Sequence, residues 1–418
     1  MAGKIFRFAL IGLVVVLSFS IEGAATDYPW TYCCGSARPY PVPAHTVSYP
    51  DSLTPVMINH VGRHGARFPA SPKQCNILLS ALKSAQAQKT LTPAGSRLLK
   101  LTQKVIGRVN GRWGALDSLG MAEQRGIASR MMAAYPELFR ESTVNAISSY
   151  APRCIMSMDE FTHQLARMDN KVELNMASGR RFSPLVRFFD SSQLYLEFRK
   201  DPSLKAMLDD FIAETCPYSQ LQRVLGEKFD YASAKADRRD VALAEYAVLS
   251  GLSAMSMKEE ITDFLTPQEQ NALWSISNMR HYLEHSASVL NDIPAKIAAP
   301  LLQDFIATTD GFIAGDKAVA KVMLRFGHAE SLMPLLSLMR LPGCFYLTNY
   351  PETVADHWKD FDIVPMAANL QMILFRAPSG AYYVRIDLNE IPVTLIAGSS
   401  TLYIPWTRAR EYLRECLL

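Results

Sequence analysis

The sequence predicts an α/β fold in which a mostly helical cap interrupts a single α/β core. Strand signals occur near the start of the chain and return beyond residue 320. Between them, residues 156–309 hold few glycines and many helix-forming residues, with breaks at prolines. The 418 residues, 49% of them hydrophobic, are enough for a large core and two or three domains. We therefore expect residues 26–155 and 310–418 to build the core and residues 156–309 to form the cap.

Composition excludes several classes of protein. With 20% charged residues and no low-complexity segment, the chain is neither disordered nor collagen-like. Seven cysteines in 418 residues are too few for a small disulfide scaffold. The net charge is +3 and no long run of Lys and Arg occurs, so we expect no nucleic-acid partner. Any anion-binding role would depend on a local pocket rather than on a basic surface.

Residues 1–25 have the pattern of a secretory signal peptide. Lys4 and Arg7 precede an apolar run over residues 8–19, and Gly23 and Ala25 supply a small-residue cleavage site. The run is shorter than the roughly 20 residues that a membrane span needs. We therefore expect export to the periplasm or the exterior, with no membrane attachment after cleavage.

Export would make disulfide bonds possible. The number of cysteines is odd, so at least one is unpaired within a monomer, and their spacing leaves the pairing open. Cys33 and Cys34 are adjacent and lack the C-x-x-C spacing of a redox motif, so we expect them to be structural.

The elements follow in order. Residues 26–54 are rich in proline and aromatic residues and are expected to form an extended arm around the body. Apolar β-branched patterns predict strands at 55–61 and 145–150, and helical periodicity predicts amphipathic helices at 77–89, 95–108 and 120–135. After the cap, strands are predicted at 321–326, 371–375, 382–386 and 392–396.

The segment Arg63-His64-Gly65-Ala66-Arg67-Phe68-Pro69 follows the first predicted strand directly. Two arginines supply planar forks of donors that suit phosphate oxygens and stay charged at any working pH. A neutral histidine between them can attack phosphorus and carry the phosphoryl group covalently. Open α/β sheets place ligands at the ends of strands, so this segment predicts a phosphate site. The alternative, a basic surface loop, would not require this spacing.

This motif resembles that of the histidine phosphatases, in their acid phosphatase and phytase branch. Three further segments follow the order of that family: Leu119-Gly120-Met121-Ala122-Glu123-Gln124 with Tyr135, Ser149-Tyr150-Ala151-Pro152-Arg153-Cys154 with Ser157, and Phe326-Gly327-His328-Ala329-Glu330. The resemblance covers most of residues 50–400. It implies the α/β core and helical cap of that family, and catalysis without a metal or other cofactor.

His-Ala-Glu at 328–330 differs from the His-Asp of most of the branch and is similar to the pattern of multiple inositol polyphosphate phosphatases. The pair Lys73-Gln74 and the segment at residues 35–40 resemble the same subfamily. The resemblance therefore implies a small-molecule substrate, an inositol polyphosphate such as inositol hexakisphosphate.

The resemblance also implies a role for each residue. Arg63, Arg67, Arg153 and His328 would surround the phosphoryl oxygens and stabilise the charge of the transition state. His64 would attack the phosphorus in line and become phosphohistidine. Glu330 would protonate the departing alkoxide and then activate the water that hydrolyses the intermediate.

Other residues are weaker predictions. Arg38, Lys73, Arg181 and Ala329 are expected to contact the substrate, although the three charged ones also fit solvated surface charge. Arg180 and Arg187 are similar candidates from the cap. His281 and His285 have the i, i+4 spacing of a metal pair, but no third ligand is evident, so we expect no metal site.

Two alternative functions remain open from the sequence. A broad acid phosphatase acting on sugar or nucleotide phosphates would fit His-Asp better than His-Ala-Glu. A non-catalytic polyanion-binding protein that kept the fold would be expected to lose His64 or Glu330, and both are present.

Overall fold

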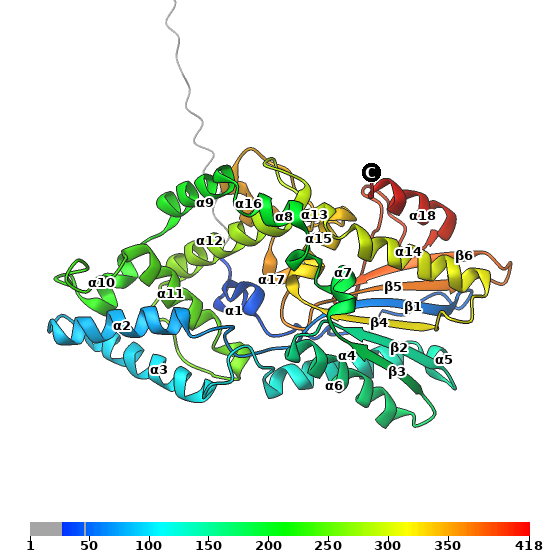
Figure 1. Cartoon of the computed structure of the whole chain (residues 1–418), viewed down its shortest axis with the longest axis horizontal. Coiled ribbons are helices and arrows are strands. Elements are labelled where there is room, and N and C mark those ends of the chain that lie inside the picture. Colours follow the sequence, from blue (N-terminus) through cyan, green and yellow to red (C-terminus); the bar gives the residue numbers. More distant parts are fainter. Residues whose placement is uncertain (1–26, 46) are drawn as a thin grey trace, which may run out of the picture.

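The computed structural model describes residues 27–45 and 47–418, so the predicted signal peptide lies outside the described residues. A sheet of eight strands in the order β3-β2-β4-β1-β5-β6-β7, with β8 paired to β6, forms the centre of this part of the chain (Figure 1). The strands are β1 Thr54–Arg63, β2 Thr143–Ser148, β3 Glu173–Ser178, β4 Val322–Gly327, β5 Asn369–Arg376, β6 Tyr382–Leu388, β7 Ile391–Val393 and β8 Ile404–Pro405. The predicted α/β class is therefore confirmed.

The two central strands bring distant parts of the chain to one edge of the sheet. Strands β3, β2, β4 and β1 run parallel, whereas β5 pairs antiparallel with β1. Arg63 at the end of β1 is in register with Gly327 at the end of β4. Since parallel neighbours end at the same edge, the residues that follow the two strands, His64 and His328, lie side by side.

Helices cover both faces of the sheet (Figure 1). On one face, Ile58 and Phe326 share an apolar cluster with residues of the helices α4 and α6. On the other, Met57 and Val61 pack in a cluster with residues of α14, α15 and α18. The helices of the core are α4 Ser118–Ala134, α5 Pro136–Phe139, α6 Pro152–Met168, α7 Ser183–Val186, α14 Ala299–Ala314, α15 Ala329–Leu338 and α18 Trp406–Glu415.

The cap has its own apolar core at the other end of the molecule (Figure 1). Its helices are α2 Lys73–Ala87, α3 Pro93–Val109, α9 Pro202–Thr215, α10 Ser219–Leu225, α11 Arg238–Ser250 and α12 Pro267–His285. Shorter helices connect the two parts: α1 Trp30–Cys33, α8 Gln193–Phe198, α13 Ile293–Lys296, α16 Val354–His357 and α17 Asp360–Ile363. The 3-10 turns are η1 Gly35–Ala37, η2 Arg180–Phe182, η3 Phe188–Asp190, η4 Ser253–Met255 and η5 Pro351–Thr353.

The division into cap and core differs from the predicted boundaries at residues 156 and 309. The predicted cap range includes most of α6, the edge strand β3, and α14, all of which pack in the core with the sheet. Conversely, α2 and α3 precede the predicted cap, but their apolar faces pack with α10 and α11. The reason is that an amphipathic helix carries no sign of which partner will cover its apolar face.

The individual elements agree well with prediction. The strands predicted at 55–61, 145–150, 321–326, 371–375 and 382–386 and the three early helices are confirmed, with ends shifted by a few residues. The strand predicted at 392–396 is shorter and earlier, as β7. The arm is not wholly extended, because α1 and η1 lie within it.

All seven cysteines lie in the described residues, where each is buried and unpaired. The disulfide bonds that export would allow are therefore absent from this structure. In residues 27–45 and 47–418, no helix combines the length and the apolar character of a bilayer span.

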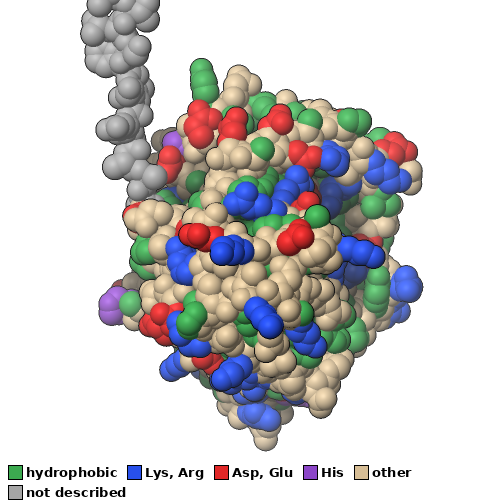
Figure 2. Space-filling view, turned by 90° about the vertical axis from the view of Figure 1, so that its left-hand side faces the viewer, with side chains coloured by type: hydrophobic (Ala, Val, Ile, Leu, Met, Phe, Trp, Pro, Cys, Tyr) green, Lys and Arg blue, Asp and Glu red, His purple; other side chains and the backbone are tan. Residues whose placement is uncertain are grey.

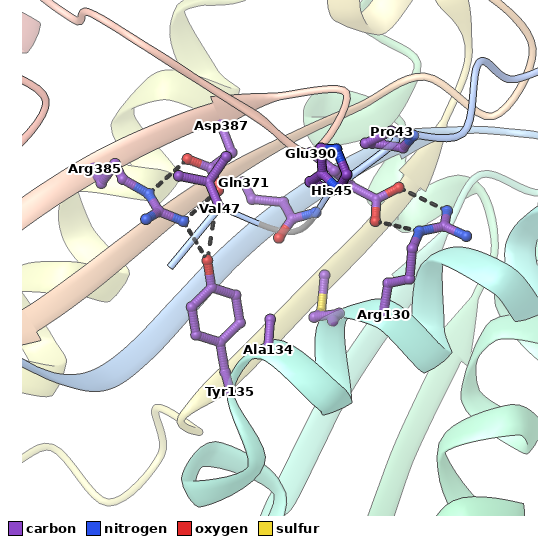
Figure 3. A pocket seen from close by; sticks show the side chains of 11 residues that line it. Pro43, His45, Val47, Arg130, Ala134, Tyr135, Gln371, Arg385, Asp387 and Glu390 are labelled. Carbon is purple, nitrogen blue, oxygen red and sulfur yellow. Dashed lines mark hydrogen bonds and ion pairs between the residues drawn. The ribbon is translucent and has the colours of Figure 1, made fainter. Parts of the chain in front are cut away.

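A small cavity of about 30 Å³ lies at the C-terminal end of α4, with room for about one water molecule (Figure 3). Two charged pairs line it: Arg130 with Glu390 at 2.8 Å, and Arg385 with Asp387 at 2.7 Å. The first pair ties α4 to the turn after β6, and Arg385 also donates to the hydroxyl of Tyr135, the residue after α4, at 2.6 Å. These contacts fix the helix whose other end contacts the motif after β1.

Candidate active site

His64 is held as a neutral imidazole at the end of β1. Only 2% of its surface is exposed, and burial, followed by the charges of Arg63 and Arg67, lowers its pKa well below the usual value. Its Nδ1 lies 2.9 Å from the carbonyl oxygen of Gly65. A carbonyl can only accept, so Nδ1 carries the proton and Nε2 keeps its lone pair. His64 is therefore prepared to act as a nucleophile through Nε2.

The start of α4 locks the loop that carries His64. A Cβ atom at Gly120 would lie 2.5 Å from the Ala66 nitrogen, and one at Gly65 would lie 2.6 Å from the Gly120 Cα. The Glu123 carboxylate accepts from the Ala66 N–H at 2.7 Å, and the Gln124 amide donates to the Arg63 carbonyl at 3.0 Å. The segment at 119–124 therefore positions the motif.

Three arginines present buried donors without acceptors. Within the described residues, the Nε atoms of Arg63, Arg67 and Arg153 are buried and make no hydrogen bond. Burial lowers the pKa of Arg63 and of Arg67 to about 10, so both stay charged at neutral pH. Arg63 adjoins His64 in the chain, and Arg153 contacts His328, whose ring centroid lies 5.7 Å from that of His64. The charges of all three arginines lower the pKa of His64. Buried unpaired donors are costly, and a bound oxyanion would satisfy them.

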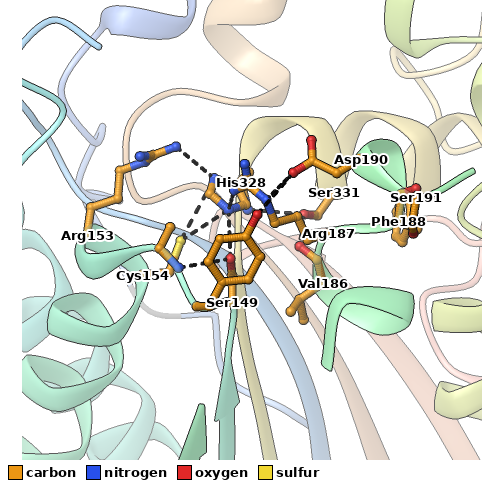
Figure 4. A network of polar contacts seen from close by, with 12 residues as sticks. Ser149, Arg153, Cys154, Val186, Arg187, Phe188, Asp190, Ser191, His328 and Ser331 are labelled. Atoms are coloured by element: carbon orange, nitrogen blue, oxygen red, sulfur yellow. Dashed lines mark hydrogen bonds and ion pairs between the residues drawn. The ribbon is translucent and has the colours of Figure 1, made fainter. Parts of the chain in front are cut away.

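Figure 4 shows His328 between donors from several segments. Its Nε2 lies 2.7 Å from Nη1 of Arg187 and 3.0 Å from the Ser149 hydroxyl, and its Nδ1 lies 3.2 Å from Nη2 of Arg153. Burial, then the charges of the two arginines, lowers the His328 pKa to about 3, against the opposing effect of Glu330. A neutral imidazole has one acceptor nitrogen, so one of the two arginines keeps a donor free for an anion.

Gly327 allows this arrangement because a larger residue would separate β4 from the segment at 180–187. A Cβ atom there would lie 2.7 Å from the Ser331 hydroxyl oxygen and 3.0 Å from the Val186 carbonyl oxygen. The Ser331 hydroxyl donates to that same carbonyl at 2.6 Å and accepts from the His328 N–H at 3.1 Å. The close approach brings Arg187 onto the imidazole of His328.

Glu330 lies half-buried in the first turn of α15, two residues after His328. Burial acts to raise its pKa, but the charges that His285 and His328 carry once protonated in acid, together with that of Arg63, outweigh it and lower the pKa to about 2. Glu330 is therefore a carboxylate in the free protein. The negative charge of a bound phosphoryl group would favour its protonated form.

The structure brings the six predicted catalytic residues together. The four predicted substrate contacts lie as follows. Ala329 is buried beside His328. Lys73 is exposed at the start of α2, next to Gln74, which lines the cavity described below. The Arg38 guanidinium lies 4.0 Å from the ring centroid of Tyr32. Arg181 stacks on Phe182 in η2, at 4.7 Å from its ring centroid.

The contacts of Arg187 and Ser149 with His328 were not predicted. The sequence predicts Arg187 as a candidate substrate contact from the cap, because nothing in its spacing shows that it packs against the start of α15. Its guanidinium is held by an ion pair with Asp190 and lies over the ring of Tyr150. Ser149 stood in a recognised segment without an assigned role; the sign available was its position one residue after β2.

A cavity of about 240 Å³ lies in front of Arg63 and Arg67. It is lined by residues of the arm, the motif, α2 and α11, and no aspartate or glutamate is among them. In the described part of the chain, no three His, Cys, Asp or Glu side chains are grouped to share a metal ion. His281 instead pairs with Asp360 at 2.7 Å, and His285 contacts the Tyr195 hydroxyl at 2.9 Å.

Comparison with known proteins gives a consistent result. The profile of the histidine phosphatase superfamily (branch 2) matches residues 56–389. Multiple inositol polyphosphate phosphatase 1 of Gallus gallus is 22% identical over 395 residues, which cover 88% of this chain and 83% of the relative. The Homo sapiens protein of the same name is 23% identical over 384 residues, covering 84% and 77%.

Solved structures share the fold. The multiple inositol polyphosphate phosphatase of Bifidobacterium longum, in complex with inositol hexasulfate, matches with a TM-score of 0.78 at 16% identity, covering 93% of this chain and 97% of that chain. The phytase of D. castellii matches with a TM-score of 0.65 at 17% identity, covering 98% and 90%. The matched profile extends from β1 past β6 and includes both histidines at the strand ends. The chain belongs to the histidine phosphatase superfamily, branch 2.

Proposed function

We propose that this chain hydrolyses phosphate monoesters of polyphosphorylated inositols, with inositol hexakisphosphate among its substrates, through a phosphohistidine intermediate. The observation that carries the proposal is the group of three buried arginine Nε donors without acceptors around the neutral His64. A phosphoryl group supplies the acceptors that these donors lack, and it presents its phosphorus to the histidine.

The reaction has two steps. Nε2 of His64 attacks the phosphorus, the P–O bond to the inositol breaks, and the departing oxygen takes a proton from Glu330. Glu330 then takes a proton from a water molecule whose oxygen attacks the phosphorus, which breaks the P–N bond and releases phosphate and His64. Arg63, Arg67 and Arg153 hold the equatorial oxygens in both steps.

The substrate class rests on the relatives and on the triplet at 328–330. The Gallus gallus and Homo sapiens proteins are named as inositol polyphosphate phosphatases, and the Bifidobacterium longum structure holds inositol hexasulfate. An inositol alkoxide is a poor leaving group, so a positioned acid such as Glu330 is needed to release it.

A panel of substrates tests the proposal. Phosphate release from inositol hexakisphosphate, glucose 1-phosphate, a nucleotide and an aryl phosphate would be measured in the presence of a chelator. We expect the highest kcat/KM for inositol hexakisphosphate. A higher value for glucose 1-phosphate or the nucleotide would instead assign a broad acid phosphatase.

The variant His64→Ala tests whether His64 is the nucleophile, and binding measurements on the wild type test whether the protein only binds its ligand. It should lose turnover while keeping a cooperative unfolding transition, and quenching the wild type with labelled substrate should trap an acid-labile, base-stable phosphoryl-protein. Turnover in His64→Ala would refute the assigned nucleophile. Binding of inositol hexakisphosphate by wild type without release of phosphate would identify a non-catalytic polyanion binder.

We further propose that residues 1–25 direct export and are removed. The seven buried cysteines are compatible with an oxidising compartment, since burial raises the pKa of Cys33, Cys34, Cys154 and Cys344 to about 12 and keeps these thiols protonated. N-terminal sequencing of the mature protein tests the cleavage site, and a chain that begins at residue 1 would contradict it.

A further inference from the structure

A second cavity, of about 290 Å³, adjoins the one in front of Arg63 and Arg67. The two cavities share four lining residues: Ser36, Ala37, Gln74 and Ala247. They are therefore neighbours along one cleft between the N-terminal arm, α2 and the cap helices α11 and α12. The reacting phosphate would occupy one end of this cleft, and nothing in the mechanism above uses the other.

The charge of this cleft has one sign. The linings of both cavities include no aspartate or glutamate, whereas Arg63 and Arg67 line one and Arg280 and His281 line the other. Elsewhere the charges are mixed: Figure 2 shows Lys and Arg interspersed with Asp and Glu over the cap end of the molecule. The cleft therefore concentrates positive charge that the surface as a whole does not carry.

Asp360 lies behind the wall of the second cavity and does not line it. Asp360 is fully buried, and it accepts from His281 at 2.7 Å, from Trp274 Nε1 at 2.9 Å and from the Ser36 N–H at 3.2 Å. Its oxygens are thus bound by protein donors. It also fixes Nδ1 of His281 as a donor and orients that ring at the cavity wall.

Arg280 has a guanidinium that the protein does not use. Its side chain is exposed at the end of α12, and among the described residues it makes no hydrogen bond, ion pair or aromatic stacking contact. Two other arginines of this region have partners in the protein: Arg38 stacks on Tyr32, and Arg187 pairs with Asp190. A guanidinium with free donors, at the wall of a cleft that carries positive charge, can bind a phosphate group through two hydrogen bonds.

We propose that Arg280 binds a second phosphate group of the substrate while a first phosphate occupies the reaction site at His64. This inference deepens the function proposed above and rests on it. Besides Arg280 and His281, the second cavity is lined by uncharged side chains, among them Leu243, Leu273 and Ile276, so Arg280 is its fixed positive charge. Arg280 would therefore select substrates that carry at least two phosphates on one ring and would ignore simple monoesters.

The test replaces Arg280 by Gln, which removes the charge at an exposed helix position where folding is little affected. Arg408 is the matched control: it is an exposed arginine of α18 that also makes no ion pair, hydrogen bond or stacking contact in the described structure and lines neither cavity. We expect kcat/KM for inositol hexakisphosphate to fall about 10-fold or more in Arg280→Gln, mainly through KM. The rate with an aryl phosphate should change by less than about twofold. Arg408→Gln should match wild type on both substrates.

A binding measurement separates this inference from the proposed function. Inositol hexasulfate and inorganic phosphate would be used as competitive inhibitors of aryl phosphate hydrolysis. Arg280→Gln should weaken inhibition by the hexasulfate about 10-fold and leave inhibition by phosphate unchanged, with Arg280→Lys in between. Equal loss with both inhibitors, or loss with neither, would overturn the role of Arg280. If wild type cleaves the aryl phosphate but not inositol hexakisphosphate, the proposed substrate fails, while the inhibition series still decides whether Arg280 binds a second anion.

Discussion

Replacing Gly120 by Ala sets two opposite expectations against each other. Gly120 is the third residue of α4, and intrinsic helix propensity favours Ala over Gly there by about 1 kcal/mol. The structure predicts the reverse, because the new Cβ would lie 2.5 Å from the Ala66 nitrogen and 2.8 Å from the Gly65 carbonyl carbon. Both neighbours are backbone atoms of the loop that carries His64, so no side chain can rotate away.

The size of the effect follows from the displacement required. An ordinary contact to a Cβ begins at 3.4 Å, so α4 and the loop must separate by about 1 Å. Overpacking of this kind costs about 1–3 kcal/mol of unfolding free energy, which exceeds the gain in propensity over most of that range. A shift of about 1 Å between a nucleophile and its phosphate is expected to cost roughly 10²-fold in rate.

Gly107→Ala provides the matched control. Gly107 lies in α3 of the cap, and a Cβ there meets nothing within 4 Å, so the substitution should stabilise the protein by about 0.5–1 kcal/mol and leave kcat unchanged. Urea unfolding and the rate of phosphate release from an aryl phosphate would be measured for both variants. If Gly120→Ala matches Gly107→Ala in stability and rate, the contact between α4 and the motif does not position His64.

Three further predictions concern chemistry and pH. Glu330→Gln should slow cleavage of inositol hexakisphosphate by about 10²–10⁴-fold, because Gln cannot supply the proton that the alkoxide needs. The pre-steady-state burst from a nitrophenyl phosphate, whose leaving group needs no proton, should fall far less, and equal losses would remove Glu330 as the acid. Chelators should leave turnover unchanged, since charge neutralisation is assigned to Arg63, Arg67 and Arg153, with the neutral His328 as a hydrogen-bonding partner; a loss restored by one divalent ion would contradict this. Burial, with the charge of Arg325, lowers the pKa of His60 to about 3, so between pH 6.5 and 3 the unfolded chain binds a proton that the native state excludes. Unfolding free energy should therefore rise with pH in that window, and His60→Gln should reduce the slope by about 1.4 kcal/mol per pH unit in urea titrations at pH 4–6.

The sequence predicted the site best where the catalytic residues directly follow a strand with a clear apolar pattern. Residues 63–69 follow a buried strand, so both the strand and the phosphate site could be predicted from one segment, and residues 326–330 repeat that situation at the next parallel strand. The contact between these segments depends on the order of the strands in the sheet, which the local sequence pattern does not contain. That order was expected only from the family resemblance.

Features that depend on packing partners could not be predicted. β3 was not predicted because Glu-Leu-Asn-Met-Ala-Ser is an edge strand with weak alternation and only partial burial. The apolar faces of α2 and α3 fit a core partner as well as a cap partner, and only the tertiary structure decides between them. Arg187 reaches His328 because Gly327 has no side chain to push away Val186, the residue before Arg187. The glycine on which this contact depends lies more than a hundred residues along the chain from the arginine.

The order of the strands along the chain has a consequence for biosynthesis. β1 is complete at residue 63, but both of its hydrogen-bonding neighbours, β4 and β5, lie between residues 322 and 376. At about 5–20 residues per second, a ribosome needs on the order of tens of seconds to make the intervening segment. Throughout that interval a strand that is buried in the folded protein has no partner and is open to pairing with other chains. The nascent chain therefore depends on being kept apart from its copies until its last quarter emerges, and an enzyme truncated before β4 would lose the strand neighbours of its nucleophile together with its second histidine.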